Sequence, residues 1–212
     1  MWLAVQCGAS AVGLVSAMPS GPGPIDEGLI AQIARATPPG VTPFLLTCEQ
    51  TADVILKQQQ RTGATVVQLT DSLEPGQYTR LSRRLPPTVK LVPVIHVVGP
   101  SSVDETRSLE PYANALLLDS GNPTLDVKEL GGTGRVHDWA VSRTIVQAVS
   151  VPVWLAGGLN PANVGEAIRQ VRPFGVDVCS GLRTNGVLDE TKLRAFMQSV
   201  RDADTGAEDA GD

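Results

Sequence analysis

The chain has 212 residues, of which 42% are apolar, and a formal net charge of −5. That length and apolar content suffice for one sizeable core, so we expect a single domain over residues 1–201. The acidic balance, without a basic stripe of interleaved aromatic residues, argues against nucleic acid as a partner, and no apolar run approaches the ~20 residues of a membrane span.

Seven short apolar runs follow one another along the chain, each succeeded by a segment with helical periodicity. The runs lie at 11–16, 41–47, 65–70, 89–98, 114–120, 151–158 and 175–181, and the helical segments at 26–36, 51–63, 74–85, 101–112, 137–149, 160–171 and 188–203. The runs are rich in Val and Leu and mostly do not alternate, which is typical of strands buried on both faces. Strict alternation of strand and helix predicts a parallel sheet with right-handed crossovers.

The ends of several elements carry local signals. Asn160-Pro161 predicts a helix start, and Asp189 predicts the N-cap of the last helix. Trp2 to Gln6 read as the end of a helix, with Gly8 where a C-cap glycine belongs. The acidic, small-residue stretch 202–212 predicts a disordered tail.

Seven strand–helix units are compatible with an open doubly wound sheet or with a (β/α)8 TIM barrel that lacks one strand. About 200 residues is the lower limit for such a barrel. Only ten residues precede the first apolar run, too few for a strand and a complete crossover helix. If the fold is a barrel, strand 1 and most of helix 1 are therefore the parts that this chain lacks.

Three cysteines, Cys7, Cys48 and Cys179, are scattered along the sequence, and no cationic segment precedes an apolar stretch at the amino terminus. This usage favours a reduced, cytoplasmic compartment with neither a disulfide framework nor a zinc site, and no signal peptide is expected. The sequence leaves the oligomeric state open.

Glycine-rich strand ends are the candidates for chemistry, which in parallel α/β folds lies at the carboxyl ends of the strands. Gly157-Gly158 and Ser180-Gly181 follow the last two predicted strands. Glycines there, followed by helix N-termini, build phosphate sites from backbone N–H groups. Tight turns alone would explain one such loop, whereas two in succession favour phosphate.

Three sequence blocks carry a family resemblance: "LLLDSG…GGTGRVHDW", "VPVWLAGGLNPANVGEAI" and "PFGVDVCSGLRTNGVLDETKLRAF". Together they resemble the carboxyl-terminal half of phosphoribosylanthranilate isomerase, a (β/α)8 barrel of tryptophan biosynthesis, with the spacing kept. Upstream, "CGASAVGLVS" resembles the junction of helix 1 and strand 2 in that family.

The resemblance implies an Amadori rearrangement of an aminated ribose phosphate, without metal or cofactor, in which Asp119 is the general acid. It further implies substrate or phosphate contacts at Gly131, Gly132, Gly157, Gly158, Asp177, Ser180, Gly181 and Arg183. The residues themselves agree for Asp119, because a carboxyl that ends an apolar run is desolvated and its pKa rises toward that of a proton donor. A loop-capping role is the alternative for Asp119, and a solvated loop position is the alternative for Arg183.

Cys7 superficially imitates the family's catalytic cysteine, which lies in K-x-C-G-x-T at the end of strand 1. The spacing excludes this assignment, because the next strand begins about four residues later and a parallel crossover needs a dozen or more. We therefore expect Cys7 to pack at the end of a helix as a small apolar residue, and the catalytic cysteine to be absent. The 212-residue chain is then expected to be poorly active.

Other positions also depart from the family pattern. "MPSGPGPI" (18–25) replaces the family's S-P-R, and Thr70-Asp71 replaces the histidine and glycine of Q-L-H-G. His96 is either a replacement acid–base group or a packed, hydrogen-bonded side chain, and His137 is expected to cap a helix. Three functions follow: the isomerase itself, a paralogue acting on another phosphosugar amine, or a non-catalytic phosphosugar-binding barrel.

Overall fold

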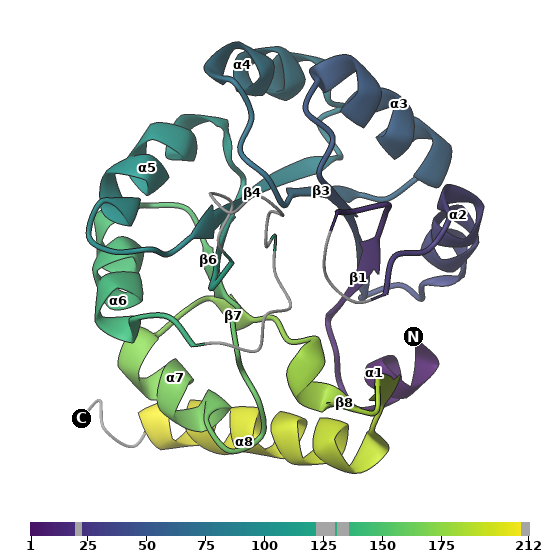
Figure 1. Cartoon of the computed structure of the whole chain (residues 1–212). Coiled ribbons are helices and arrows are strands. Elements are labelled where there is room, and N and C mark those ends of the chain that lie inside the picture. The colour runs from purple at the N-terminus through teal and green to yellow at the C-terminus, as the bar shows by residue number, and fades with distance from the viewer. Residues whose placement is uncertain (20–22, 122–129, 131–135, 209–212) are drawn as a thin grey trace.

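A computed structural model of the chain describes residues 1–19, 23–121, 130 and 136–208, with side chains to residue 205 in the last helix. Seven parallel strands curl around a common centre, and helices pack on the outside (Figure 1). The strands are β1 (Ala11–Val15), β2 (Thr42–Thr47), β3 (Val66–Leu69), β4 (Lys90–His96), β5 (Leu116–Asp119), β6 (Val153–Leu155) and β7 (Gly175–Val176).

Each strand pairs with the next in the chain, so that the order in the sheet is the order in the sequence. A doubly wound sheet would instead reverse its strand order at a switch point. The barrel order predicted from the sequence is confirmed, and β1 and β7 form the two edges of the sheet within the described residues.

Helices alternate with the strands, as predicted. They are α1 (Trp2–Gln6), α2 (Glu27–Ala36), α3 (Ala52–Thr62), α4 (Pro75–Arg84), α5 (Ser102–Leu109), α6 (Trp139–Ala148), α7 (Val164–Val171) and α8 (Glu190–Glu208), with 3-10 turns at Glu110–Tyr112 and Ser180–Leu182. As expected, Asp189 caps α8, since its Oδ1 accepts hydrogen bonds from the N–H groups of Thr191 and Lys192.

The start of α7 differs from the prediction, which placed it at Asn160-Pro161. Asn160 Oδ1 accepts a hydrogen bond from Ala162 N at 2.9 Å, and Asn163 Oδ1 accepts one from Asn160 N at 2.8 Å. Asparagine side chains that bond nearby backbone stabilise a turn instead of a helix. The helix therefore begins at Val164, with Asn163 as its N-cap.

Two further corrections concern the carboxyl-terminal part. The strands β8 (Arg183–Thr184) and β9 (Val187–Leu188) form an antiparallel hairpin that was not predicted, although its turn residues Asn185 and Gly186, both with positive φ, are a strong hairpin signal. Helix α8 runs on to Glu208, so the tail expected from residue 202 begins inside a helix. The helical segment predicted from the sequence ends at Ala203, which is only 1% exposed, and the structure continues the helix beyond it to Glu208.

The amino terminus agrees with the sequence interpretation. Helix α1 ends at Gln6, Cys7 is its C-cap, and Gly8 adopts a φ of 103° that favours glycine. Cys7 belongs to the large apolar cluster that contains Leu193 and Phe196 of α8. It therefore packs in the layer between sheet and helices, as predicted, and not inside the barrel.

Alternation along the strands separates two apolar layers. In β4, Leu91 and Ile95 belong to the cluster under the helices, whereas Val92 and Val94 belong to a second cluster that fills the barrel. Leu117 and Trp154 extend the second cluster across β5 and β6. Because successive side chains of a strand point to opposite faces, this pattern fixes which strand-end residues face the interior.

Among the described residues, no helix is both long enough and apolar enough to cross a membrane.

The packing of the three free cysteines predicts their order of reaction with a thiol reagent. Cys179 is exposed, Cys48 is intermediate and Cys7 is buried. We expect 5,5′-dithiobis(2-nitrobenzoate) to modify Cys179 first in the native protein and Cys7 only on unfolding, because burial excludes the reagent. Peptide mapping by mass spectrometry at timed intervals measures this, and modification of Cys7 as fast as Cys179 would contradict its placement.

Candidate active site

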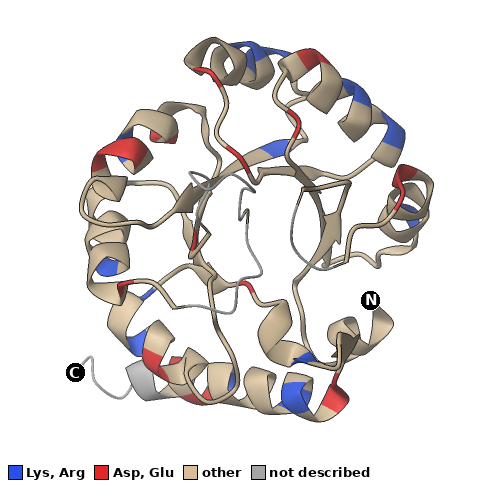
Figure 2. Cartoon of the chain, viewed as in Figure 1, with Lys and Arg blue, Asp and Glu red and all other residues tan. Residues whose placement is uncertain are grey.

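Three ionisable side chains lie on the interior face at the carboxyl ends of the strands. His96 ends β4 two residues after the interior Val94, Asp119 ends β5 two residues after the interior Leu117, and Asp177 follows β7. In contrast, most charged residues lie on the surrounding helices, and few border the centre of the barrel (Figure 2).

Asp119 is a buried carboxyl, and few favourable interactions offset the cost of burying it. Its side chain is 7% exposed, and Oδ1 accepts a hydrogen bond from Ser120 N at 2.7 Å. Burial raises the pKa of Asp119, while the Ser120 hydrogen bond and the His96 ring lower it, and burial dominates. Such a carboxyl keeps its proton to a higher pH than usual and can deliver it to a bound molecule.

Asp177 interacts electrostatically with Asp119. Burial and, secondarily, the charge of Asp119 raise the pKa of Asp177 to about 6, against a hydrogen bond from Val178 N that lowers it. Two carboxyls that face one site resist ionising together, so the first proton lost makes the second harder to remove. The pair can therefore hold a proton near neutral pH.

His96 is 5% exposed, and its Nε2 lies 2.9 Å from the carbonyl oxygen of Thr70. The sequence favoured a packed, hydrogen-bonded histidine here, and that part of the interpretation agrees. The sequence alone did not reveal that His96 lies on the interior face, next to Asp119. The spacing with Val92 and Val94 is the signal that could have shown it.

The two glycine loops pack backbone against backbone. A Cβ built on Gly181 would lie 2.0 Å from the carbonyl oxygen of Leu159, and one on Gly157 would lie 2.8 Å from Ser120 N. Gly157 and Gly158 have φ of 84° and 64°, which favour glycine. The ends of β5, β6 and β7 are therefore held together at distances that only glycine permits.

The same loops present unused hydrogen-bond donors. Within the described part of the chain, the backbone N–H groups of Gly157, Gly158, Ser180 and Gly181 have no hydrogen-bond acceptor. Clustered free N–H groups at strand ends attract anions such as phosphate. The structure thus places these four predicted residues on neighbouring loops, after β6 and β7.

Arg183, in β8, is turned toward its own hairpin. Its Nη1 donates to the carbonyl oxygen of Gly186 at 2.7 Å, and a Cβ built on Gly23 would lie 3.6 Å from Nη2. The guanidinium therefore lies beside the segment that follows β1, on the carboxyl side of that strand. The predicted Gly131 and Gly132 lie outside the described residues.

His137 does not cap α6, contrary to expectation. Asp138 is the N-cap, and its Oδ1 accepts from Ala140 N at 2.8 Å, whereas His137 Nε2 pairs with Ser142 Oγ at 2.7 Å. A short carboxylate reaches the first-turn N–H groups more readily than an imidazole does, which explains the exchange of roles. Burial lowers the pKa of His137 to about 4, so the ring is neutral at physiological pH.

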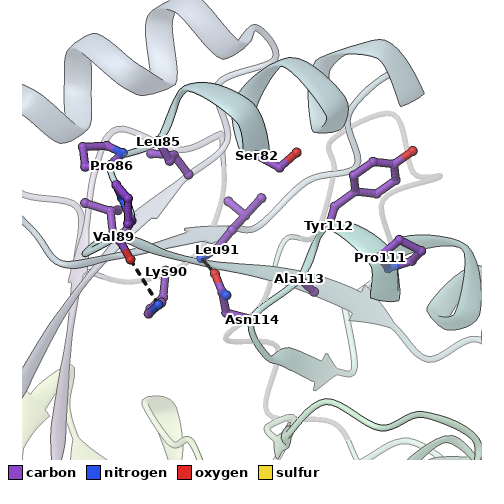
Figure 3. Close-up of a pocket in the computed structure, with 11 residues that line it drawn as sticks. Ser82, Leu85, Pro86, Val89, Lys90, Leu91, Pro111, Tyr112, Ala113 and Asn114 are labelled. Atoms are coloured by element: carbon purple, nitrogen blue, oxygen red, sulfur yellow. Dashed lines mark hydrogen bonds between the residues drawn. The ribbon is translucent and has the colours of Figure 1, made fainter.

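Two surface pockets lie elsewhere. One, shown in Figure 3, is formed where β4 and β5 begin, with Lys90, Leu91, Tyr112 and Asn114 in its wall. The other is lined by residues at or near the amino ends of the strands, including Thr42. Both are thus at the end of the strands opposite to His96, Asp119 and Asp177.

Comparison with known proteins agrees with this geometry. The family model for N-(5'-phosphoribosyl)anthranilate (PRA) isomerase matches residues 31–199. N-(5'-phosphoribosyl)anthranilate isomerase 2 of Methanosarcina mazei is 41% identical over 94% of this chain and 88% of its own length, and the Haloarcula marismortui isomerase is 36% identical over 96% and 91%.

Solved structures show the same fold. The crystal structure of the Thermotoga maritima phosphoribosyl anthranilate isomerase superposes with a TM-score of 0.80 at 25% identity, covering 95% of this chain and 92% of that one. A second isomerase structure, in complex with reduced 1-(o-carboxyphenylamino)-1-deoxyribulose 5-phosphate, has a TM-score of 0.77 at 23% identity, covering 95% and 92%. The strand order, the family model and the curated relatives therefore agree, and the chain belongs to the N-(5'-phosphoribosyl)anthranilate isomerase family.

Proposed function

We propose that the protein catalyses the Amadori rearrangement of N-(5'-phosphoribosyl)anthranilate to 1-(2-carboxyphenylamino)-1-deoxyribulose 5-phosphate, a step of tryptophan biosynthesis. The observation that carries the proposal is Asp119, a buried carboxyl with a raised pKa, beside two loops whose backbone N–H groups have no acceptor among the described residues. Membership of the isomerase family supports this substrate over another phosphosugar amine.

The phosphate of the substrate binds to the N–H groups of Gly157, Gly158, Ser180 and Gly181. No lysine or arginine is required for this contact, because several oriented N–H groups supply the positive potential. Anchoring the phosphate there places the ribose over the carboxyl ends of β5 to β7, within the region that Asp119 and Asp177 face. Asp177 and Arg183 contribute further substrate contacts, with Arg183 toward the segment after β1.

Asp119 acts as the general acid. Its proton passes to the furanose ring oxygen, the bond from that oxygen to C1 breaks, and the nitrogen lone pair forms a Schiff base with C1. A base then removes the C2 proton, and the resulting enolamine becomes the ketone as C1 gains a proton. The reaction moves only protons and bonding pairs within one molecule, so it needs no external oxidant or cofactor.

Cys7 takes no part in this proposal. The thiol packs between sheet and helices, outside the barrel, and cannot reach a sugar at the carboxyl ends of the strands. Cys7→Ala is therefore a matched control for changes at Asp119.

We expect Asp119→Asn to lower kcat by a factor on the order of 10²–10⁴, because the amide keeps the shape of the carboxyl but cannot donate its proton to the ring oxygen. Cys7→Ala should leave kcat nearly unchanged. The decrease in substrate fluorescence measures turnover. It is measured in the 212-residue chain and in a form extended by an amino-terminal strand ending in Cys-Gly. We expect the extended form to turn over faster. Full activity of Asp119→Asn, or a large loss in Cys7→Ala alone, would contradict these assignments.

A separate prediction tests the phosphate loops. Gly181→Ala places a Cβ 2.0 Å from the Leu159 carbonyl oxygen, so the two loops must separate, and we expect at least a tenfold loss of affinity for ribulose 5-phosphate. Gly76→Ala is the control, because a Cβ there, on an exposed turn of α4, has no neighbour within 4 Å. Isothermal titration calorimetry compares the two, and equal affinities would place the phosphate elsewhere.

A further inference from the structure

His96 lies next to Asp119, and the proposed reaction gives His96 no role. The two residues are register partners on the adjacent strands β4 and β5, and Val97 N donates to the carbonyl oxygen of Asp119 at 2.9 Å. Both side chains face the interior and both are more than nine-tenths buried. The backbone pairing therefore holds the imidazole and the carboxyl side by side.

The contact with Thr70 fixes which ring nitrogen can change its protonation. A carbonyl oxygen only accepts hydrogen bonds, so Nε2, at 2.9 Å from Thr70 O, carries a proton. The other nitrogen, Nδ1, is buried and has no hydrogen-bond partner among the described residues. Nδ1 is therefore the atom at which the ring becomes neutral or cationic.

His96 differs from the other described ionisable neighbour of Asp119 in the charge that it can carry. Asp119 interacts electrostatically with Asp177 at the end of β7 and with His96 of β4, and His96 also interacts with Glu105 of α5. Of the two described ionisable neighbours of Asp119, the Asp177 carboxyl can only be neutral or negative, whereas the imidazole can be positive. A positive ring opposes the effect of burial on Asp119.

We propose that His96 is a positioning residue whose charge at Nδ1 sets the proton-donating strength of Asp119. The inference rests on the proposed function, in which Asp119 is neutral before the first step and ionised after it. In that step the O–H bond of Asp119 breaks, the ring oxygen gains the proton and its bond to C1 breaks, while His96 keeps its own protons. The imidazole stabilises the buried carboxylate that remains.

The decisive experiment needs no substrate. Carbon-13 NMR of the Asp119 carboxyl, assigned with Asp119→Asn, gives its titration midpoint in the wild type and in His96→Gln. We expect the midpoint to rise by roughly 1 pH unit in His96→Gln, because an opposite charge is lost. The control is His137→Gln, a change at the only other histidine of the chain, which should leave the midpoint unchanged. An unchanged or lower midpoint in His96→Gln would overturn the proposal.

A second set of NMR measurements applies if His96→Gln does not fold. In the wild type, nitrogen-15 NMR of the two imidazoles should show Nε2 of His96 protonated. His96→Arg, which keeps a positive charge, should keep the midpoint at or below its wild-type value. An Asp119 midpoint in His96→Arg that lies above the wild-type value would also overturn the proposal.

Measurements of turnover distinguish a failure of this inference from a failure of the proposed function. In His96→Gln the basic limb of the kcat profile should move to higher pH by the same amount as the NMR midpoint, with KM within about twofold of the wild type. If the wild type and its extended form both fail to convert phosphoribosylanthranilate, the proposed function fails, while the NMR midpoints still decide the role of His96.

Discussion

Each strand of this sheet contributes side chains to two apolar layers at once, one under the helices and one inside the barrel. Leu91 and Ile95 face the helices while Val92 and Val94 fill the barrel, and the same alternation runs through β5 and β6. Because this constraint extends to the last residue of β4 and of β5, the polar residues His96 and Asp119 at those interior positions are buried like the core. The chemistry of the site follows from that enforced burial.

Burial determines the electrostatics more than any partner does. It is the largest influence on the pKa of both Asp119 and Asp177, and the two carboxyls then affect each other across the end of β6. In water either group would ionise well below neutral pH and would have no proton left to donate. Within the barrel, burial raises the pKa of both groups, and for Asp119 the His96 ring acts in the opposite direction.

Backbone contacts at glycines give the site its shape. Gly157 lies against Ser120, which follows β5, and Gly181 lies against Leu159, so three strand ends are joined through two contacts that exclude a side chain. These contacts bring together two loops whose N–H groups have no acceptor within the described part of the chain, next to Ser120, the residue after Asp119. The loop after β6 is therefore packed both against the end of β5, through Gly157, and against the loop after β7, through Leu159.

The sequence by itself determined the seven parallel strands, the packing of Cys7 and the candidate glycine loops, because periodicity, turn residues and motif spacing are local properties. The barrel order and the candidate role of Asp119 came from the resemblance to the isomerase family. The sequence did not determine where α7 begins, that α8 continues past residue 203, or that Asp138 caps α6 in place of His137. Only the tertiary structure joined His96 to Asp119 and to Thr70. These residues are more than twenty positions apart in the chain, and the register between strands, which a single sequence does not encode locally, brings them together.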